Sequence, residues 1–87
     1  MLPENRPRWW HYDLELSPHV LDRMTDRGFS EADLRIMMEN VVRLNQGSRP
    51  GRWNLETTHL GDPWEVVVEP DEHERLIVVI TAYKVNT

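Results

Sequence analysis

A histidine and two arginines recur every four residues in the first third of the chain. On a helix, the spacing of His19, Arg23 and Arg27 places their side chains along one stripe. One titratable proton carrier beside two permanent cations is what a phosphate-directed site requires. The imidazole can act as a general base, and the guanidiniums can hold a phosphate and stabilise the charge of its transition state. The alternative is a solvated helix face, on which these side chains bond to neighbouring aspartates.

Two further groups of side chains extend this candidate site. Thr81 and Tyr83 lie near the C-terminus, and strand alternation places both hydroxyls on one face. Tyr83 can then donate a proton or orient a ribose, unless it only caps the edge of the core. Arg43, Arg49 and Arg52 flank a stretch rich in Gly, Pro and Ser, and can form a basic lip over a bound anion. Such a stretch is also typical of a solvated turn.

The histidine and arginine stripe lies on a helix with both ends marked in the sequence. Ser17 is a preferred N-cap, Pro18 suits the first helical position, and Gly28 can adopt the left-handed conformation that ends a helix. These signals predict a helix over residues 18–27.

A second helix follows after only two or three residues. Ser30 and Asp33 have the spacing of a capping box. The apolar stripe that follows predicts a helix over residues 31–41 and consists of Leu34, Met37, Met38 and Val41. The short connection predicts a helical hairpin.

Strand patterns occupy both sides of the two helices. Alternating or continuous apolar residues predict strands over 11–16, 52–60, 64–69 and 75–83. The last of these is almost entirely apolar, which favours a central position in the sheet. We therefore expect one α+β domain over residues 1–87, with the order β-α-α-β-β-β. An antiparallel-rich sheet would carry the helical hairpin on one face, with residues 1–10 as a loose arm before a core of residues 11–84.

The composition restricts the classes of function. The chain has no cysteine and a formal net charge of −5, so thiolate metal sites and broad, non-specific nucleic-acid binding are disfavoured. The histidines have no metal-binding spacing, and no phosphate-binding glycine loop is present. We expect no metal and no cofactor. No apolar run is long enough to cross a membrane and no signal peptide is evident, so we expect a cytoplasmic protein.

Three segments together resemble a known family. These are S-x-H-x-x-x-R-M-x-x-R-G-F-S over 17–30, W-E-V-V-V-E-P-D over 64–71 and L-I-V-V-I-T-A-Y over 76–83. They are similar to small bacterial domains of unassigned function whose layout resembles RelE/BrnT-type toxins, a group that includes barnase-like and colicin-type ribonucleases. The resemblance covers about residues 11–84 and implies a metal-independent ribonuclease with an antitoxin partner.

The resemblance also implies roles for the candidate residues. His19 would move a proton while Arg23 and Arg27 neutralise the phosphorane-like state, and Thr81 and Tyr83 would complete the site. Attack of the ribose 2′-hydroxyl on the adjacent phosphate would leave a 2′,3′-cyclic phosphate. The chain is acidic, whereas toxins of this type are usually basic.

Two other functions remain open at this stage. A non-catalytic interaction domain would bind a partner protein, or a second copy of the chain, through Trp9, Trp10 and the arginine-bearing loop. An enzyme acting on a small phosphorylated substrate would use the same arginines. RNA turnover and the oligomeric state distinguish these alternatives.

Overall fold

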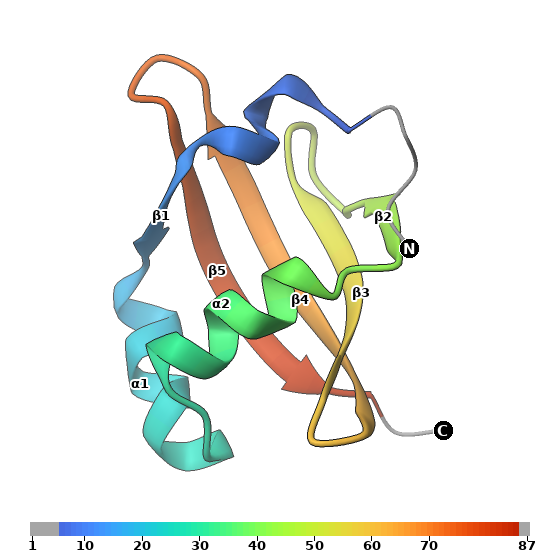
Figure 1. The fold of residues 1–87 in the computed structure, drawn as a ribbon. Coiled ribbons are helices and arrows are strands. Elements are labelled where there is room, and N and C mark those ends of the chain that lie inside the picture. Colours follow the sequence, from blue (N-terminus) through green and yellow to red (C-terminus); the bar gives the residue numbers. More distant parts are fainter. Residues whose placement is uncertain (1–5, 86–87) are drawn as a thin grey trace.

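The computed structural model describes residues 6–85 and contains two helices packed against one five-stranded sheet (Figure 1). The elements in chain order are a 3-10 helix η1 (Arg8–His11), β1 (Asp13–Leu16), α1 (Pro18–Arg27), α2 (Glu31–Glu39), β2 (Arg43–Gln46), β3 (Trp53–His59), β4 (Asp62–Asp71) and β5 (Leu76–Lys84). The predicted α+β class and the order β-α-α-β-β-β are confirmed, with one additional short strand, β2.

The helix boundaries follow the capping signals. The Ser17 hydroxyl accepts a hydrogen bond from the backbone N–H of Val20, and Gly28 ends α1 with φ 70°. Ser30 and Asp33 form the expected reciprocal capping box at the start of α2. This helix ends at Glu39, two residues before the predicted end, although Val41 is still buried in the core.

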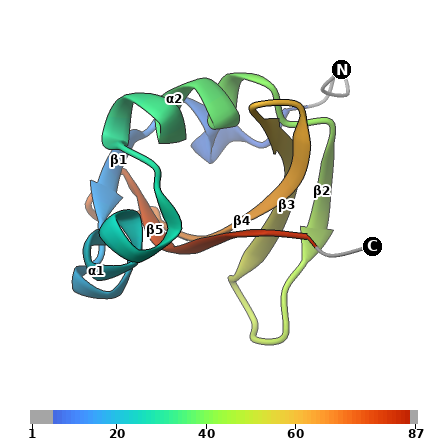
Figure 2. The same cartoon turned by 90° about the horizontal axis from the view of Figure 1, so that it is seen from below.

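The sheet has the strand order β1-β5-β4-β3-β2. β1 runs parallel to β5, and the three other pairs are antiparallel. Figure 2 shows that the sheet curves around α2, so that this helix covers the concave face. The core between them includes Leu34 and Met37 of α2 and Leu55, Val66 and Val79 of the sheet. No helix of the described residues covers the other face of β3, β4 and β5.

The expectation of a loose arm over residues 1–10 needs correction in its second half. Residues 1–5 lie outside the described part of the chain, but residues 8–11 form η1. Trp9 is only 7% exposed, and its ring lies 5.6 Å from that of Trp10 and 5.9 Å from that of Trp53. The burial of this large apolar ring is a favourable term that fixes the segment against the sheet. The first strand accordingly begins at Asp13 rather than at His11.

One extra residue in β5 changes which side chains face the core. Val67 pairs with Thr81, but the next residue, Val68, pairs with Val79, so Ile80 has no partner on β4. Such a β-bulge shifts the alternation by one residue. Val79 before it and Ala82 after it are both buried. Thr81 and Tyr83 therefore lie on the face of the sheet that α2 does not cover, which we call the open face.

Candidate functional site

The helix α1 lies beside the second half of β5, where it occupies the place of a missing strand. β1 pairs with β5 only as far as Val79, which leaves the backbone of the following residues without a strand on that side. Ser17 donates from its backbone N–H to the carbonyl of Val79 (3.1 Å) and from its hydroxyl to that of Ile80 (3.0 Å). At the other end of α1, Nη1 of Arg27 donates to the carbonyl of Ala82 (2.8 Å). The helix is thus fixed to β5 at both ends, because these carbonyls need donors.

Arg27 connects the predicted stripe with the predicted residues of the last strand. Its Nη1 also donates to the Thr81 hydroxyl at 3.2 Å. Tyr83 lies two residues further along the same face, directly opposite Glu65 of β4. Burial and the nearby Glu65 carboxylate raise the pKa of Tyr83 above its usual value. The structure therefore brings Arg27, Thr81 and Tyr83 together and adds Glu65, which the sequence analysis missed.

The rest of the stripe does not converge with Arg27. His19 is an exposed residue at the second position of α1. Arg23 forms an ion pair with Asp26 (Nη1–Oδ2, 3.4 Å), and its buried Nε has no hydrogen-bond partner among the described residues. At about 1.5 Å per residue, the backbones of His19 and Arg27 lie about 12 Å apart along the helix axis. A stripe of that length is better matched to an extended anion than to a single phosphate group.

The three arginines predicted to bind substrate do not form one lip. Arg49 and Arg52 border an open hollow of about 560 Å³ that is lined by the β2–β3 loop. Arg52 also contacts Glu69 (Nη2–Oε1, 3.7 Å). Arg43 lies on β2 and faces Glu56 (Nη1–Oε2, 3.9 Å). In Figure 1 the β2–β3 loop lies at the opposite end of the sheet from the end of β5, so this basic loop is separate from the α1–β5 junction.

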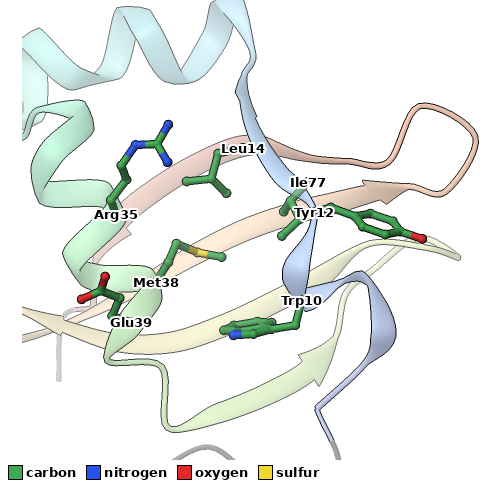
Figure 3. A pocket seen from close by; sticks show the side chains of 7 residues that line it. All are labelled: Trp10, Tyr12, Leu14, Arg35, Met38, Glu39 and Ile77. Atoms are coloured by element: carbon green, nitrogen blue, oxygen red, sulfur yellow. The ribbon is translucent and has the colours of Figure 1, made fainter.

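A second cavity, of about 240 Å³, lies between α2 and the segment that contains η1 and β1. Figure 3 shows Leu14, Met38 and Ile77 around this cavity, with Trp10 on one side and Glu39 on the other. None of the predicted catalytic or substrate-binding residues lines it. Trp10 is therefore half-buried against a cavity rather than displayed on an open surface.

Within residues 6–85, no group of three or more His, Cys, Asp or Glu side chains is arranged to hold a metal ion. Neither described helix is long and apolar enough to span a membrane.

Comparison with known proteins assigns the chain to a family. The model of a domain of unknown function, DUF4258, matches residues 16–84. The chain belongs to this family. The matched region of the DUF4258 domain runs from the end of β1 to the end of β5, and so includes both sides of the α1–β5 junction.

One solved structure has a similar fold. The 1.1 Å crystal structure of the Brucella abortus ribonuclease toxin BrnT superposes with a TM-score of 0.66, at 15% sequence identity. The alignment covers 87% of the DUF4258 chain and 99% of the BrnT chain. This similarity establishes a BrnT-like fold, as the resemblance noted above implied. Among the curated proteins, none matches the chain.

Proposed function

We propose that this DUF4258 domain is a metal-independent endoribonuclease of the toxin type, whose activity a partner antitoxin neutralises. The contact between Arg27 and Thr81 carries the proposal, because it joins the imidazole-bearing helix to the two hydroxyls of β5. The similarity of the fold to a ribonuclease toxin supports it. The α1–β5 junction is the proposed active site.

The proposed reaction needs a proton acceptor, a phosphate clamp and a means of placing the ribose. His19 accepts the proton of the 2′-hydroxyl as this attacks the adjacent phosphorus, and returns a proton to the departing 5′-oxygen. The products are a 2′,3′-cyclic phosphate and a free 5′-hydroxyl. Arg23, about one turn from His19, stabilises the charge on the phosphorane-like state, and Arg27, about two turns from His19, holds the next phosphate of the strand. Arg27 uses Nη1 for both of its protein contacts, so its Nη2 and Nε donors remain for an anion.

The basic loop supplies a second contact in this proposal. Arg49 and Arg52 lie far from the α1–β5 junction, so they bind phosphates of the same strand at a distance from the cleaved bond. Arg43 faces a carboxylate and contributes less to the binding of RNA.

Cleavage of RNA in the presence of EDTA tests the proposal. The purified chain is incubated with a labelled RNA oligonucleotide, and the products are separated on a denaturing gel and examined for cyclic phosphate ends. His19→Ala should lower the rate by at least about 100-fold, the usual contribution of a general acid–base. His73→Ala is the matched control, because His73 is an exposed histidine of the β4–β5 loop. Equal rates for the two variants, or intact RNA with the native chain, would refute the proposed function.

A non-catalytic interaction domain is the second candidate, and the charge of the open face favours it. Glu56, Glu65 and Glu69 lie on this face, and the chain has a formal net charge of −5. A basic partner protein fits such a surface better than RNA does. Trp9 is buried and cannot be part of a docking surface. This candidate predicts a complex or homodimer in light scattering after size-exclusion chromatography, together with no RNA turnover.

A further inference from the structure

A row of polar residues crosses four strands on the open face and ends at Tyr83. Each member lies directly opposite the next in the strand register, in the order Arg43, Glu56, Glu65 and Tyr83. Directly opposed residues on one face of an antiparallel pair have Cβ atoms about 4.5–5.5 Å apart, so each side chain lies beside the next one in the row. Arg43 and Asn45 both contact the Glu56 carboxylate, which leaves Glu65 as the partner of Tyr83.

The contact with Glu65 defines what the Tyr83 phenol can do. An ionised carboxylate only accepts hydrogen bonds, so the phenol O–H is the donor between the two residues. Burial and the Glu65 carboxylate both raise the pKa of Tyr83, which keeps the phenol protonated at neutral pH. Glu65, the register partner of Tyr83 on β4, is therefore the acceptor available to the O–H, while a lone pair of the phenol oxygen remains free to accept. Of the two roles expected from the sequence, this arrangement favours orientation of a ribose over donation of a proton.

We propose that Glu65 holds Tyr83 as a hydrogen-bond acceptor for a ribose 2′-hydroxyl, so that the pair distinguishes RNA from DNA. The inference rests on the proposed function, because it places the pair beside the phosphate held by Arg27. The 2′-hydroxyl is the group that differs between the two nucleic acids, and it can donate to an oxygen. Glu65 does not touch the nucleic acid in this scheme and is a positioning residue.

Binding of matched oligonucleotides tests this inference without relying on catalysis. Fluorescence anisotropy measures the affinity of a labelled RNA hexanucleotide and of the DNA of the same sequence, in EDTA and in a His19→Ala background that prevents cleavage. One neutral hydrogen bond predicts about 3- to 10-fold tighter binding of the RNA. Tyr83→Phe removes the acceptor oxygen and should bring the ratio of the two affinities close to one. Glu65→Gln should lower this ratio, because the amide N–H2 can donate to the phenol oxygen that a carboxylate leaves free.

Glu69→Gln is the matched control for charge. Glu69 lies on the same face of the same strand, but its register partner on β5 is Val78, and its carboxylate contacts Arg52. Either glutamine variant removes one negative charge and should strengthen the binding of RNA and DNA alike, because a carboxylate repels phosphates. Only Glu65→Gln should change the ratio of the affinities.

Titration of the phenol gives a second, independent measurement. Tyr12→Phe leaves Tyr83 as the single tyrosine, whose ionisation is followed by ultraviolet absorbance. Glu65→Gln should lower the pKa of Tyr83, because it removes a carboxylate that disfavours the phenolate, and Glu69→Gln should leave this pKa almost unchanged.

The outcomes separate this inference from the proposed function. An RNA preference that Tyr83→Phe abolishes and Glu65→Gln lowers, in a protein that does not cleave RNA, supports the inference and refutes catalysis. Cleavage of RNA with no RNA preference, or with a preference that Glu65→Gln and Tyr83→Phe retain, overturns the inference alone. An unchanged pKa of Tyr83 in Glu65→Gln also overturns it. If neither nucleic acid binds, both proposals fail.

Discussion

Replacement of Arg27 by alanine separates its structural contribution from the proposed catalytic one. The guanidinium fixes the end of α1 to β5 through the Ala82 carbonyl and the Thr81 hydroxyl. Any loss of activity in Arg27→Ala therefore has two candidate causes, which are a missing phosphate contact and a detached helix end. The change in stability tells how large the second cause is.

The two bonds set the expected magnitude. The bond to the carbonyl is short and charge-assisted, but the side chain is accessible to water, so we assign it about 1 kcal/mol. The longer bond to the hydroxyl contributes about 0.5 kcal/mol. A cation in the last turn adds a few tenths of a kcal/mol through the helix dipole. The free energy of unfolding should fall by about 2 kcal/mol, which corresponds to roughly 8–16 °C in Tm for a domain of this size.

Urea unfolding followed by tryptophan fluorescence measures this difference, and Arg23→Ala is the control. Arg23 lies one helical turn away and forms only an exposed pair with Asp26, so its removal should cost less than about 0.5 kcal/mol. If Arg27→Ala loses no more stability than Arg23→Ala, the two hydrogen bonds do not fix the helix, and our account of the α1–β5 junction is wrong.

Three other substitutions test the fold. Leu60 is 86% exposed, has φ 52° and precedes Gly61 in a two-residue hairpin turn. Because Asn adopts a positive φ more readily than Leu, Leu60→Asn should raise the free energy of unfolding by about 0.5–1 kcal/mol in a urea titration. An unchanged free energy of unfolding would contradict the assigned turn. Trp9→Ala should cost about 3–5 kcal/mol in the same experiment, whereas a loose arm would lose almost nothing. The backbone N–H and hydroxyl of Ser30 hold the pKa of Asp33 below its usual value of 3.8. This carboxylate therefore stabilises the fold above pH 3.8, and its contribution is lost as the pH falls through the pKa of the folded state. Asp33→Asn should therefore flatten the dependence of Tm on pH below about pH 4. If the variant shows the same dependence of Tm on pH as the native chain, the capping box does not stabilise the fold in this way.

The helices could be predicted from the sequence because their signals are local. Ser17 and Gly28 act within one turn of the helix ends that they mark, and neither depends on the rest of the fold. The helical stripe of His19, Arg23 and Arg27 follows from those ends. Its contact with Thr81 could not be predicted, because the parallel pairing of β1 with β5 sets the place of α1 beside the last strand.

The strand β2 and the burial of Trp9 were missed for the same physical reason. β2 has four residues of which only Leu44 is apolar, so no alternating pattern predicts a strand there. It forms because β3 offers it an edge. Trp9 is buried against Trp53, a residue far along the chain. Glu65 was missed because its pairing with Tyr83 depends on the register of β4 against β5. Non-local pairing of this kind leaves no trace in the spacing of one segment.

The unpaired Ile80 is a residue that the pairing of β5 with β4 does not need. Without it the two strands would pair without interruption, so the Tyr83 phenol would stay on the open face and the Ala82 methyl group would stay in the core. The deletion would instead remove the carbonyl that accepts from the Ser17 hydroxyl, together with the additional twist that a bulge gives to a strand. A shortened β5 should therefore keep its side chains on the same faces and hold the start of α1 less firmly.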